Sequence, residues 1–185
     1  MFTRRAGFAR PFAFAMAAIF LHMATACSTP KPPTPFQTRE DAEDFRQSLL
    51  TDARTIDKFT GETRAGENVS EFSLGWLVYT ILVSASSTDE RLYHFFNADG
   101  RDTQLYLRTT FHDHPVQQIA ALDALIAEHP SPLRYAARYA LESLRHIPES
   151  DEPPNAQQRD RGELADNLAR LSANLKQAAA EVHFP

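Results

Sequence analysis

Apolar residues recur every three or four positions over the stretch that follows Thr38. This is the spacing of one face of an α-helix. Thr38 carries a short hydroxyl side chain of the type favoured at the residue before a helix. The pattern therefore predicts an amphipathic helix that begins after Thr38 and presents one apolar face to a core. The residues of that face are Ala42, Phe45, Leu49, Ala53 and Ile56.

A second apolar run extends from Phe72 to Val83. Asn68 and Glu71 precede it with the spacing of a capping box, which favours a helix. Its tryptophan, tyrosine and β-branched residues also suit a strand, and periodicity does not separate a buried helix from a buried strand. The run is shorter than the roughly 20 apolar residues of a membrane span. We interpret it as the central buried element, with a helix favoured over a strand.

Residues 87–111 fit two different structures. Ser87 and Glu90 have capping-box spacing, whereas Asp99-Gly100 is typical of a hairpin turn. We favour two short helices, because the neighbouring segments all have a helical pattern, and the hairpin is the alternative. The strands of that hairpin would be residues 92–96 and 105–111.

Further helices are predicted over 115–128 and from Ser131 onward. In the second, Ser131 and Pro132 stand in the order of an N-cap followed by a first-turn proline. Acidic residues and a Pro-Pro pair predict a linker over 149–155. The last helix, predicted over 156–183, carries an apolar seam with heptad-like steps of three and four residues. That seam consists of Leu164, Leu168, Leu171, Leu175, Ala178 and Val182.

These elements predict an all-α fold, a compact helical domain of about five to seven helices with a C-terminal heptad-like helix. The alternative is an α+β fold with a β-hairpin around Asp99-Gly100. The seam of the last helix is expected to pack on the core of its own domain. A partner-binding role for that helix is the alternative.

The N-terminus has the pattern of an export signal. Arginines precede an apolar stretch at 12–23, and the small residues 24–26 lead directly to Cys27, the only cysteine. This segment resembles the signal peptide of bacterial lipoproteins. The resemblance implies cleavage before Cys27, acylation of Cys27 with chains such as palmitate and, because Ser28 follows, an outer-membrane lipoprotein that faces the periplasm. Ala24 stands where such signals usually carry leucine, and residues 24–26 also suit ordinary signal peptidase, so a soluble periplasmic or secreted protein is the alternative.

Four prolines between residues 28 and 37 favour an extended backbone, which predicts a tether between the lipid and the folded domain. The predicted segments of the chain are a signal peptide (1–26), the lipidation site and Pro-rich tether (27–37), a helical core domain (38–148), a linker (149–155) and the C-terminal helix (156–183).

The charge balance limits the classes of partner. Removal of residues 1–26 takes away three arginines, which leaves 16 basic against 24 acidic residues and changes the formal charge from −5 to −8. An acidic surface argues against binding to nucleic acid and against adsorption to anionic lipids. We expect the membrane contact to be the lipid on Cys27, and we expect a cationic protein as partner.

One predicted helix carries residues with the chemistry of a binding surface. Its arginines and tyrosines suit phosphates, sugars or an acidic peptide. Glu142 lies four residues after Arg138 and three before Arg145, so a solvated face with intrahelical ion pairs is the competing interpretation. The candidate residues are Arg134, Tyr135, Arg138, Tyr139 and Arg145.

Candidates for catalysis or metal binding are few. His112 and His114 are possible metal ligands, but zinc takes three or four, and a polar linker is the favoured interpretation. The sequence contains no nucleophile elbow of the form G-x-S-x-G, no H-E-x-x-H helix and no glycine-rich phosphate loop. We therefore expect neither an enzyme nor a cofactor.

The sequence thus favours a non-enzymatic protein-binding module of the cell envelope. Its acidic charge favours a periplasmic inhibitor, or immunity protein, of a cationic enzyme. The alternatives are an assembly or pilot factor of a secretion or pilus system, and a metal-binding or hydrolytic envelope protein. A binding module needs an exposed apolar patch. We expect that patch around Tyr135 and Tyr139 or on the seam of the last helix.

Overall fold

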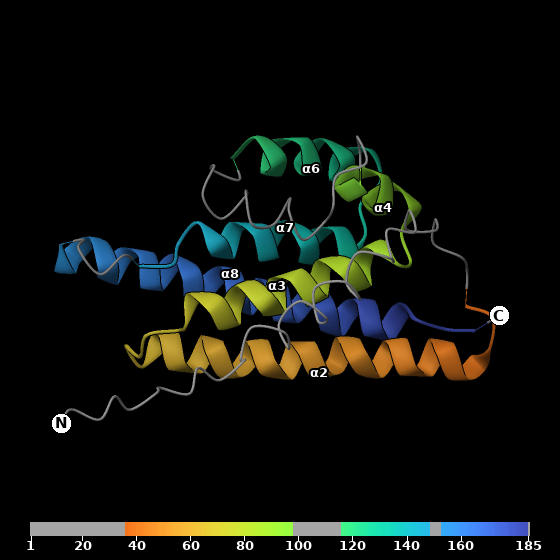
Figure 1. Cartoon of the computed structure of the whole chain (residues 1–185), viewed down its shortest axis with the longest axis horizontal. Helices are drawn as coiled ribbons and strands as arrows, with labels where there is room; N and C mark the ends of the chain where they lie inside the picture. The colour runs from red at the N-terminus through yellow and green to blue at the C-terminus, as the bar shows by residue number, and fades with distance from the viewer. Residues whose placement is uncertain (1–35, 98–115, 149–152, 185) are drawn as a thin grey trace, which may run out of the picture. The chain divides into compact units, whose positions relative to one another are not determined.

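The computed structural model describes residues 36–97, 116–148 and 153–184. Over these ranges the chain forms six α-helices and no β-strand (Figure 1). The predicted all-α class is confirmed for the described part of the chain. The helices are α2 (Arg39–Arg64), α3 (Glu71–Ser86), α4 (Glu90–Asn97), α6 (Val116–Glu128), α7 (Pro132–Leu144) and α8 (Pro154–Glu181).

Two strand alternatives are wrong. The run from Phe72 to Val83 lies within α3, and residues 92–96, the first strand of the hairpin alternative, lie within α4. Other predictions fall outside the described residues. These are the signal peptide, Cys27 and most of its tether, the Asp99-Gly100 turn, the strand at 105–111, His112, His114 and residues 149–152 of the linker.

The two longest helices, α2 and α8, lie side by side (Figure 1). They run antiparallel, because Asp57 of α2 contacts Lys176, whereas Arg64, later in α2, contacts Asp166, earlier in α8. The predicted seam of α8 is the side that packs on the rest of the domain. Its buried members join buried residues of α2 in one core, which contains Leu49, Ala53, Ile56, Leu164, Leu168, Leu171 and Leu175.

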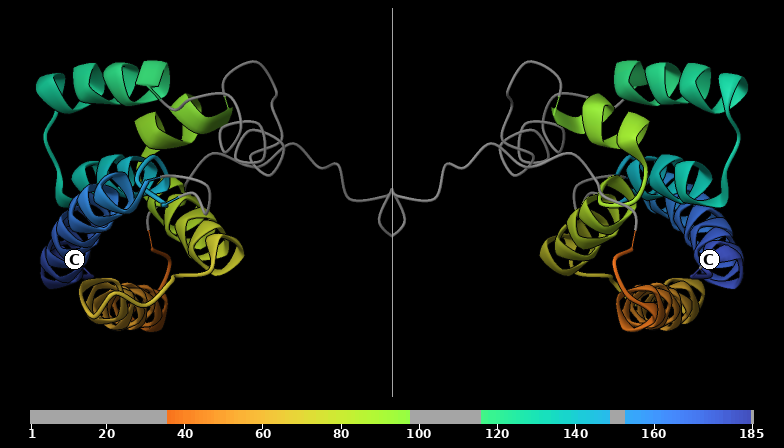
Figure 2. Two further views of the ribbon diagram at one scale, coloured as in Figure 1. Left: turned by 90° about the vertical axis from the view of Figure 1, so that its left-hand side faces the viewer. Right: turned by 90° about the vertical axis from the view of Figure 1, so that its right-hand side faces the viewer.

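α7 contacts three other helices, α8, α3 and α6 (Figure 2). Its buried residues are mostly small, with Ala136, Ala137 and Ala140 fully buried. Small side chains at a helix contact let the neighbouring helix axes approach closely. The alanines of α7 therefore allow one short helix to be a shared packing surface for several neighbours.

α3 packs through one side against α7, α4 and α2. Its buried side carries Leu74, Val78, Ile81 and Leu82. Within the described ranges, no helix combines the length and the apolar character needed to cross a bilayer. These four buried side chains of α3 belong to the core of the domain.

Two predicted helix starts are confirmed. Thr38 and Asp41 form a capping box at α2, in which Thr38 Oγ1 accepts from the Asp41 amide (3.0 Å) and Asp41 Oδ2 accepts from the Thr38 amide (2.9 Å). Ser131 is the N-cap of α7, with Pro132 in the first turn. Each cap satisfies an amide that the helix itself leaves without a partner.

Two other caps differ from prediction. α3 is capped by Ser70 rather than Asn68, whose side chain accepts a hydrogen bond from Arg161 of α8 instead (3.0 Å). Ser87 ends α3 as its C-cap, and Asp89 caps α4 by accepting from two first-turn amides at 3.0 and 3.1 Å. In both cases the true cap lies two residues nearer the helix than the predicted one.

Candidate functional site: an exposed apolar face on α3

The side of α3 that points away from the core is also apolar. Phe72 is 83% exposed, Trp76 61% and Val83 41%. Tyr79 is half-buried, and its ring lies 5.7 Å from that of Trp76, centroid to centroid. We call these four residues the α3 face. They follow one another at steps of four, three and four residues, so they share one side of the helix.

The α3 face is electrically neutral. No charged residue occurs between Phe72 and Ser86. The exposed or half-buried residues beside the face are Ser73, Thr80 and Ser84, and the Thr80 hydroxyl donates a hydrogen bond to the Trp76 carbonyl (3.1 Å). A contact with this surface therefore removes few polar groups and no charge of α3 from water, which lowers the cost of binding.

The prediction of a buried element at Phe72–Val83 is therefore correct for one side of α3 and wrong for the other. Large apolar residues occupy both the core side and the exposed side of the helix, so periodicity does not tell which of the two faces the core. Large exposed apolar side chains in a cluster are informative, because single ones are common but clusters mark interaction surfaces. The α3 face was missed by the sequence analysis for this reason.

Arg134, predicted to contact a partner, is instead part of the interior. Its side chain is 9% exposed and forms two bonds with the Asp89 carboxylate, Nε to Oδ2 at 2.7 Å and Nη2 to Oδ1 at 2.9 Å. Its third bond goes to the His129 carbonyl (2.6 Å). The guanidinium thus ties the start of α4 to the α6–α7 turn, and it is not available to a ligand.

The surroundings of Asp89 act on the pKa of its carboxyl group in two opposite directions. Burial alone raises the pKa of its carboxyl. The hydrogen bonds and charge of Arg134, together with the amides at the start of α4, outweigh burial and lower the pKa below its ordinary value of 3.8. Asp89 is therefore ionised at neutral pH and serves two structural roles at once, as N-cap and as ion-pair partner.

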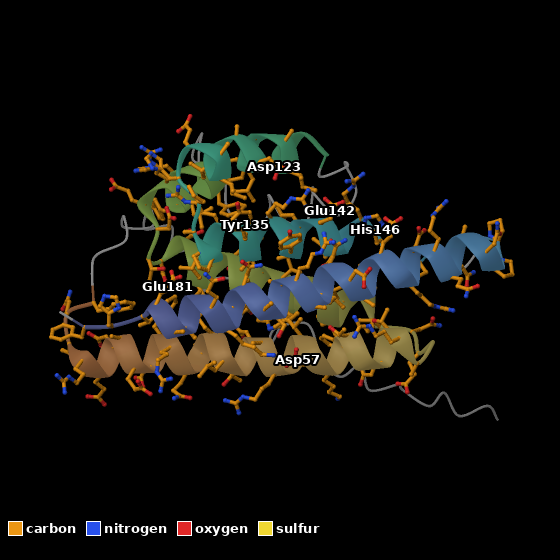
Figure 3. The ribbon with its side chains drawn as sticks, turned by 180° about the vertical axis from the view of Figure 1, so that it is seen from behind. Asp57, Asp123, Tyr135, Glu142, His146 and Glu181 are labelled. Atoms are coloured by element: carbon orange, nitrogen blue, oxygen red, sulfur yellow. The ribbon has the colours of Figure 1, made fainter. Side chains whose placement is uncertain are left out.

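Arg138 and Arg145 form the ion pairs that the sequence suggested. Arg145 Nη1 lies 2.9 Å and Arg138 Nη1 3.7 Å from the Glu142 carboxylate. Arg138 also reaches Asp123 of α6, Nε to Oδ1 at 3.0 Å (Figure 3). The interpretation as a helix face with internal pairs is confirmed for these two arginines.

The two tyrosines of α7 differ in exposure. Tyr139 is half-buried, with the guanidinium groups of Arg138 and Arg170 at 5.3 and 5.7 Å from its ring centre. Tyr135 is 37% exposed. The five residues predicted as one binding surface are therefore divided between an interior ion pair, contacts within α7 and with α6 and α8, and one exposed ring.

Sequence reasoning also missed a contact between α7 and α8. The imidazole of His146 lies between two carboxylates, Nε2 at 3.3 Å from Glu142 and Nδ1 at 3.1 Å from Glu163 (Figure 3). No group of three or more His, Cys, Asp or Glu side chains within the described ranges is placed to hold a metal ion. The role of this histidine is to bridge the end of α7 to α8.

A second polar contact joins α2 and α8. The Asp57 carboxylate accepts from Ser172 Oγ at 2.6 Å and from Lys176 Nζ at 2.7 Å. Ser172 is buried, and its hydroxyl also lies 3.2 Å from the Ala53 carbonyl. The hydroxyl is engaged within the helix pair, so this group fixes the register of α2 against α8.

Asp52 is the one buried carboxylate side chain of α2. It is 9% exposed, and its Oδ2 atom has no hydrogen-bond partner. Burial raises the pKa of Asp52 to about 6. Asp52 stands three residues after Leu49 and four before Ile56, so the helical spacing that predicts the apolar face of α2 also places this aspartate on that face.

The described residues define a class of protein, a small all-α domain with ion pairs between its helices and a neutral aromatic face on α3. Membership of this class does not by itself indicate an activity. The chain matches no protein-family model, no curated protein and no solved structure. Its function has to be argued from its own residues.

Proposed function

We propose that this protein is an envelope lipoprotein that acts by binding protein rather than by catalysis, and that the α3 face is its contact surface. The observation that carries the proposal is the exposure of Phe72 and Trp76 on a helix side without charge. The lipid on Cys27 and the tether that follows it complete the proposal, from the resemblance of residues 1–27 to a lipoprotein signal.

The size of the α3 face supports a specific contact. Aromatic side chains bury about 150–250 Å² each, so the exposed parts of Phe72, Trp76 and Val83 amount to roughly 350 Å². Burial of that area is worth about 9 kcal/mol before the costs of association. A patch of this size lies within the range of the largest patches on monomeric proteins, which are often functional.

The charge of the remaining surface favours one role within this class. The chain has 24 acidic residues against 19 basic ones, and loss of the N-terminal arginines increases the difference. An acidic surface attracts cationic proteins and speeds their association. We therefore favour an inhibitor of a cationic protein over an assembly or pilot factor.

Photo-crosslinking tests the contact surface. A photoreactive amino acid replaces Trp76 in cells that make the full chain, and another replaces Tyr135, the exposed ring on α7. We expect a discrete protein adduct from position 76 and none, or a different set, from position 135. Folded protein that gives only lipid adducts or no adduct at position 76 would contradict the proposal.

A further inference from the structure

We propose that the α3 face binds the α3 face of a second copy of this chain, in an antiparallel two-fold pair. This inference rests on the proposed function, because it names a partner for the same surface. Two-fold dimers are the commonest oligomers, and their interfaces use one surface patch twice. The acidic remainder of each copy stays free for a cationic protein.

The order of side chains along α3 favours the antiparallel arrangement. When two copies of α3 cross midway between positions 77 and 78, position 72 of one copy lies opposite position 83 of the other, and position 76 lies opposite position 79. Phe72 thus meets Val83, and Trp76 meets Tyr79. Large rings face a smaller side chain at both ends, which is the alternation that close packing requires.

A parallel pair lacks this complementarity. At one end of the interface it places Phe72 on Phe72 and Trp76 on Trp76, so the large rings are crowded. At the other end it places Val83 on Val83, which leaves space between the helices. Trp76 and Tyr79 already pack together within one copy at 5.7 Å. The antiparallel pair extends this contact into a cluster of four rings at the centre of the interface, where binding energy concentrates.

Charge also favours a second copy at this surface. Two copies of an acidic protein repel one another over most of their surfaces. α3 from Phe72 to Ser86 contributes no charge, and its borders are serine and threonine. Contact through the α3 face therefore brings two like-charged molecules together along the stretch Phe72–Ser86, which adds no charge to their repulsion; Glu71, directly before it, is the one charged residue of α3.

The buried area fits a weak, reversible dimer and is too small for a stable one. The apolar parts of the two faces add to roughly 700 Å². The bordering hydroxyl side chains bring the total toward the ~1,000 Å² expected of a weak biological interface. A foreign partner has to supply a matching neutral apolar surface of its own, whereas a second copy supplies it by symmetry.

Trp76 is the only tryptophan in the chain, so its emission reports on this face alone. The purified full-length chain with Cys27→Ala, which carries neither a lipid nor a thiol, is examined by sedimentation and by fluorescence over a range of concentrations. We expect a reversible monomer–dimer equilibrium below millimolar concentration, as for a weak interface. Tryptophan emission should shift to shorter wavelength as the dimer forms.

Variants test both the surface and the register. Phe72→Glu or Val83→Lys alone should raise the dissociation constant by at least about 30-fold, as for hot-spot residues. The double variant with both changes should recover much of that loss, because the new carboxylate lies opposite the new ammonium group in the antiparallel pair. Tyr135→Glu on α7 is the matched control and should leave the equilibrium unchanged. Circular dichroism checks that each variant remains helical.

Two results would overturn the dimer. One is a full chain that stays monomeric with constant tryptophan emission up to millimolar concentration. The other is a dimer whose dissociation constant is unchanged by Phe72→Glu alone and by Val83→Lys alone. If the crosslink from position 76 then reaches a different protein, the proposed function stands without the dimer. If it reaches no protein, both fail.

Discussion

At the scale of single residues, Asp52 and Asp57 show how position on one helix sets opposite electrostatics. Both are on α2, five residues apart. Asp52 is buried, and burial raises its pKa to about 6. For Asp57 burial also acts to raise the pKa, but hydrogen bonds from Lys176 and Ser172 outweigh it, and the pKa is lowered. One carboxylate opposes folding at neutral pH and the other supports it.

The first prediction concerns the pH dependence that Asp52 creates. The pKa of Asp52 in the folded chain, about 6, exceeds the ordinary value of 3.8. Between about pH 4 and pH 6, Asp52 therefore keeps its proton in the folded chain and loses it in the unfolded chain. Stability therefore falls as pH rises between about 4 and 6, and the penalty is complete above pH 6. Asp52→Asn should raise the free energy of unfolding by about 2–3 kcal/mol at pH 8 and by little at pH 4. Urea denaturation at the two pH values measures this.

Asp57→Asn is the matched control, and its effect has the opposite sign. A lowered folded pKa contributes stability above the pKa of the unfolded state, and this contribution is lost as pH falls. Asp57→Asn should therefore destabilise the protein at pH 8 and still do so at pH 4, and its effect should fade only at lower pH. Equal effects of Asp52→Asn at both pH values would contradict the assignment.

The second prediction concerns the ion pair of Arg134 with Asp89. Removal of one partner leaves the other as an uncompensated charge in a largely buried site. Arg134→Met should cost about 3–5 kcal/mol of unfolding free energy. Arg138→Met, which removes the more exposed pair with Asp123, a longer pair with Glu142 and a contact with the Tyr139 ring, should cost clearly less. Denaturant titration compares the two, and similar costs would show that Arg134 is not a buried anchor.

At the scale of elements, helix α8 supplies the other half of the core that α2 begins. Its four leucines at 164, 168, 171 and 175 are all buried. The third prediction is that Leu171→Ala lowers the free energy of unfolding by about 2–5 kcal/mol, as truncation of a fully buried leucine does. The same change at Leu125 of α6, which is only half-buried, should cost clearly less. Thermal or urea unfolding measures both.

The sequence predicts a helix and its buried side correctly when the helix has only one apolar side. The seam of α8 and the caps Thr38 and Ser131 are examples, because their signals lie within a few residues of each other. The orientation of α3 could not be read, since both of its sides are apolar. The burial of Arg134 could not be read either, because its partner Asp89 is 45 residues away and meets it only in the folded chain.

At the scale of the whole molecule, the fourth prediction concerns attachment to the membrane, which rests on the resemblance of residues 1–27 to a lipoprotein signal. The chain should fractionate with membranes and gain the mass of a lipid on Cys27. Cys27→Ala should release it into the soluble fraction, whereas Ser28→Ala, the neighbouring control, should leave attachment unchanged. Membrane fractionation measures the attachment, and an intact-mass measurement detects the lipid. Membrane attachment that survives Cys27→Ala would show that another part of the chain holds it there.

Because α2 packs against α8, folding of the domain depends on the order in which these two helices are synthesised. A chain emerges from the ribosome, or from a translocation channel, beginning with its N-terminus, so α2 is available long before α8. Until residues 154–181 arrive, Leu49, Ala53 and Ile56 lack the helix that covers them in the finished domain. Such long-range closure slows folding and leaves apolar surface open meanwhile. Of the described helices, α2, which is made first, therefore packs only after α8, which is made last, and until then its apolar side stays open to a holding chaperone.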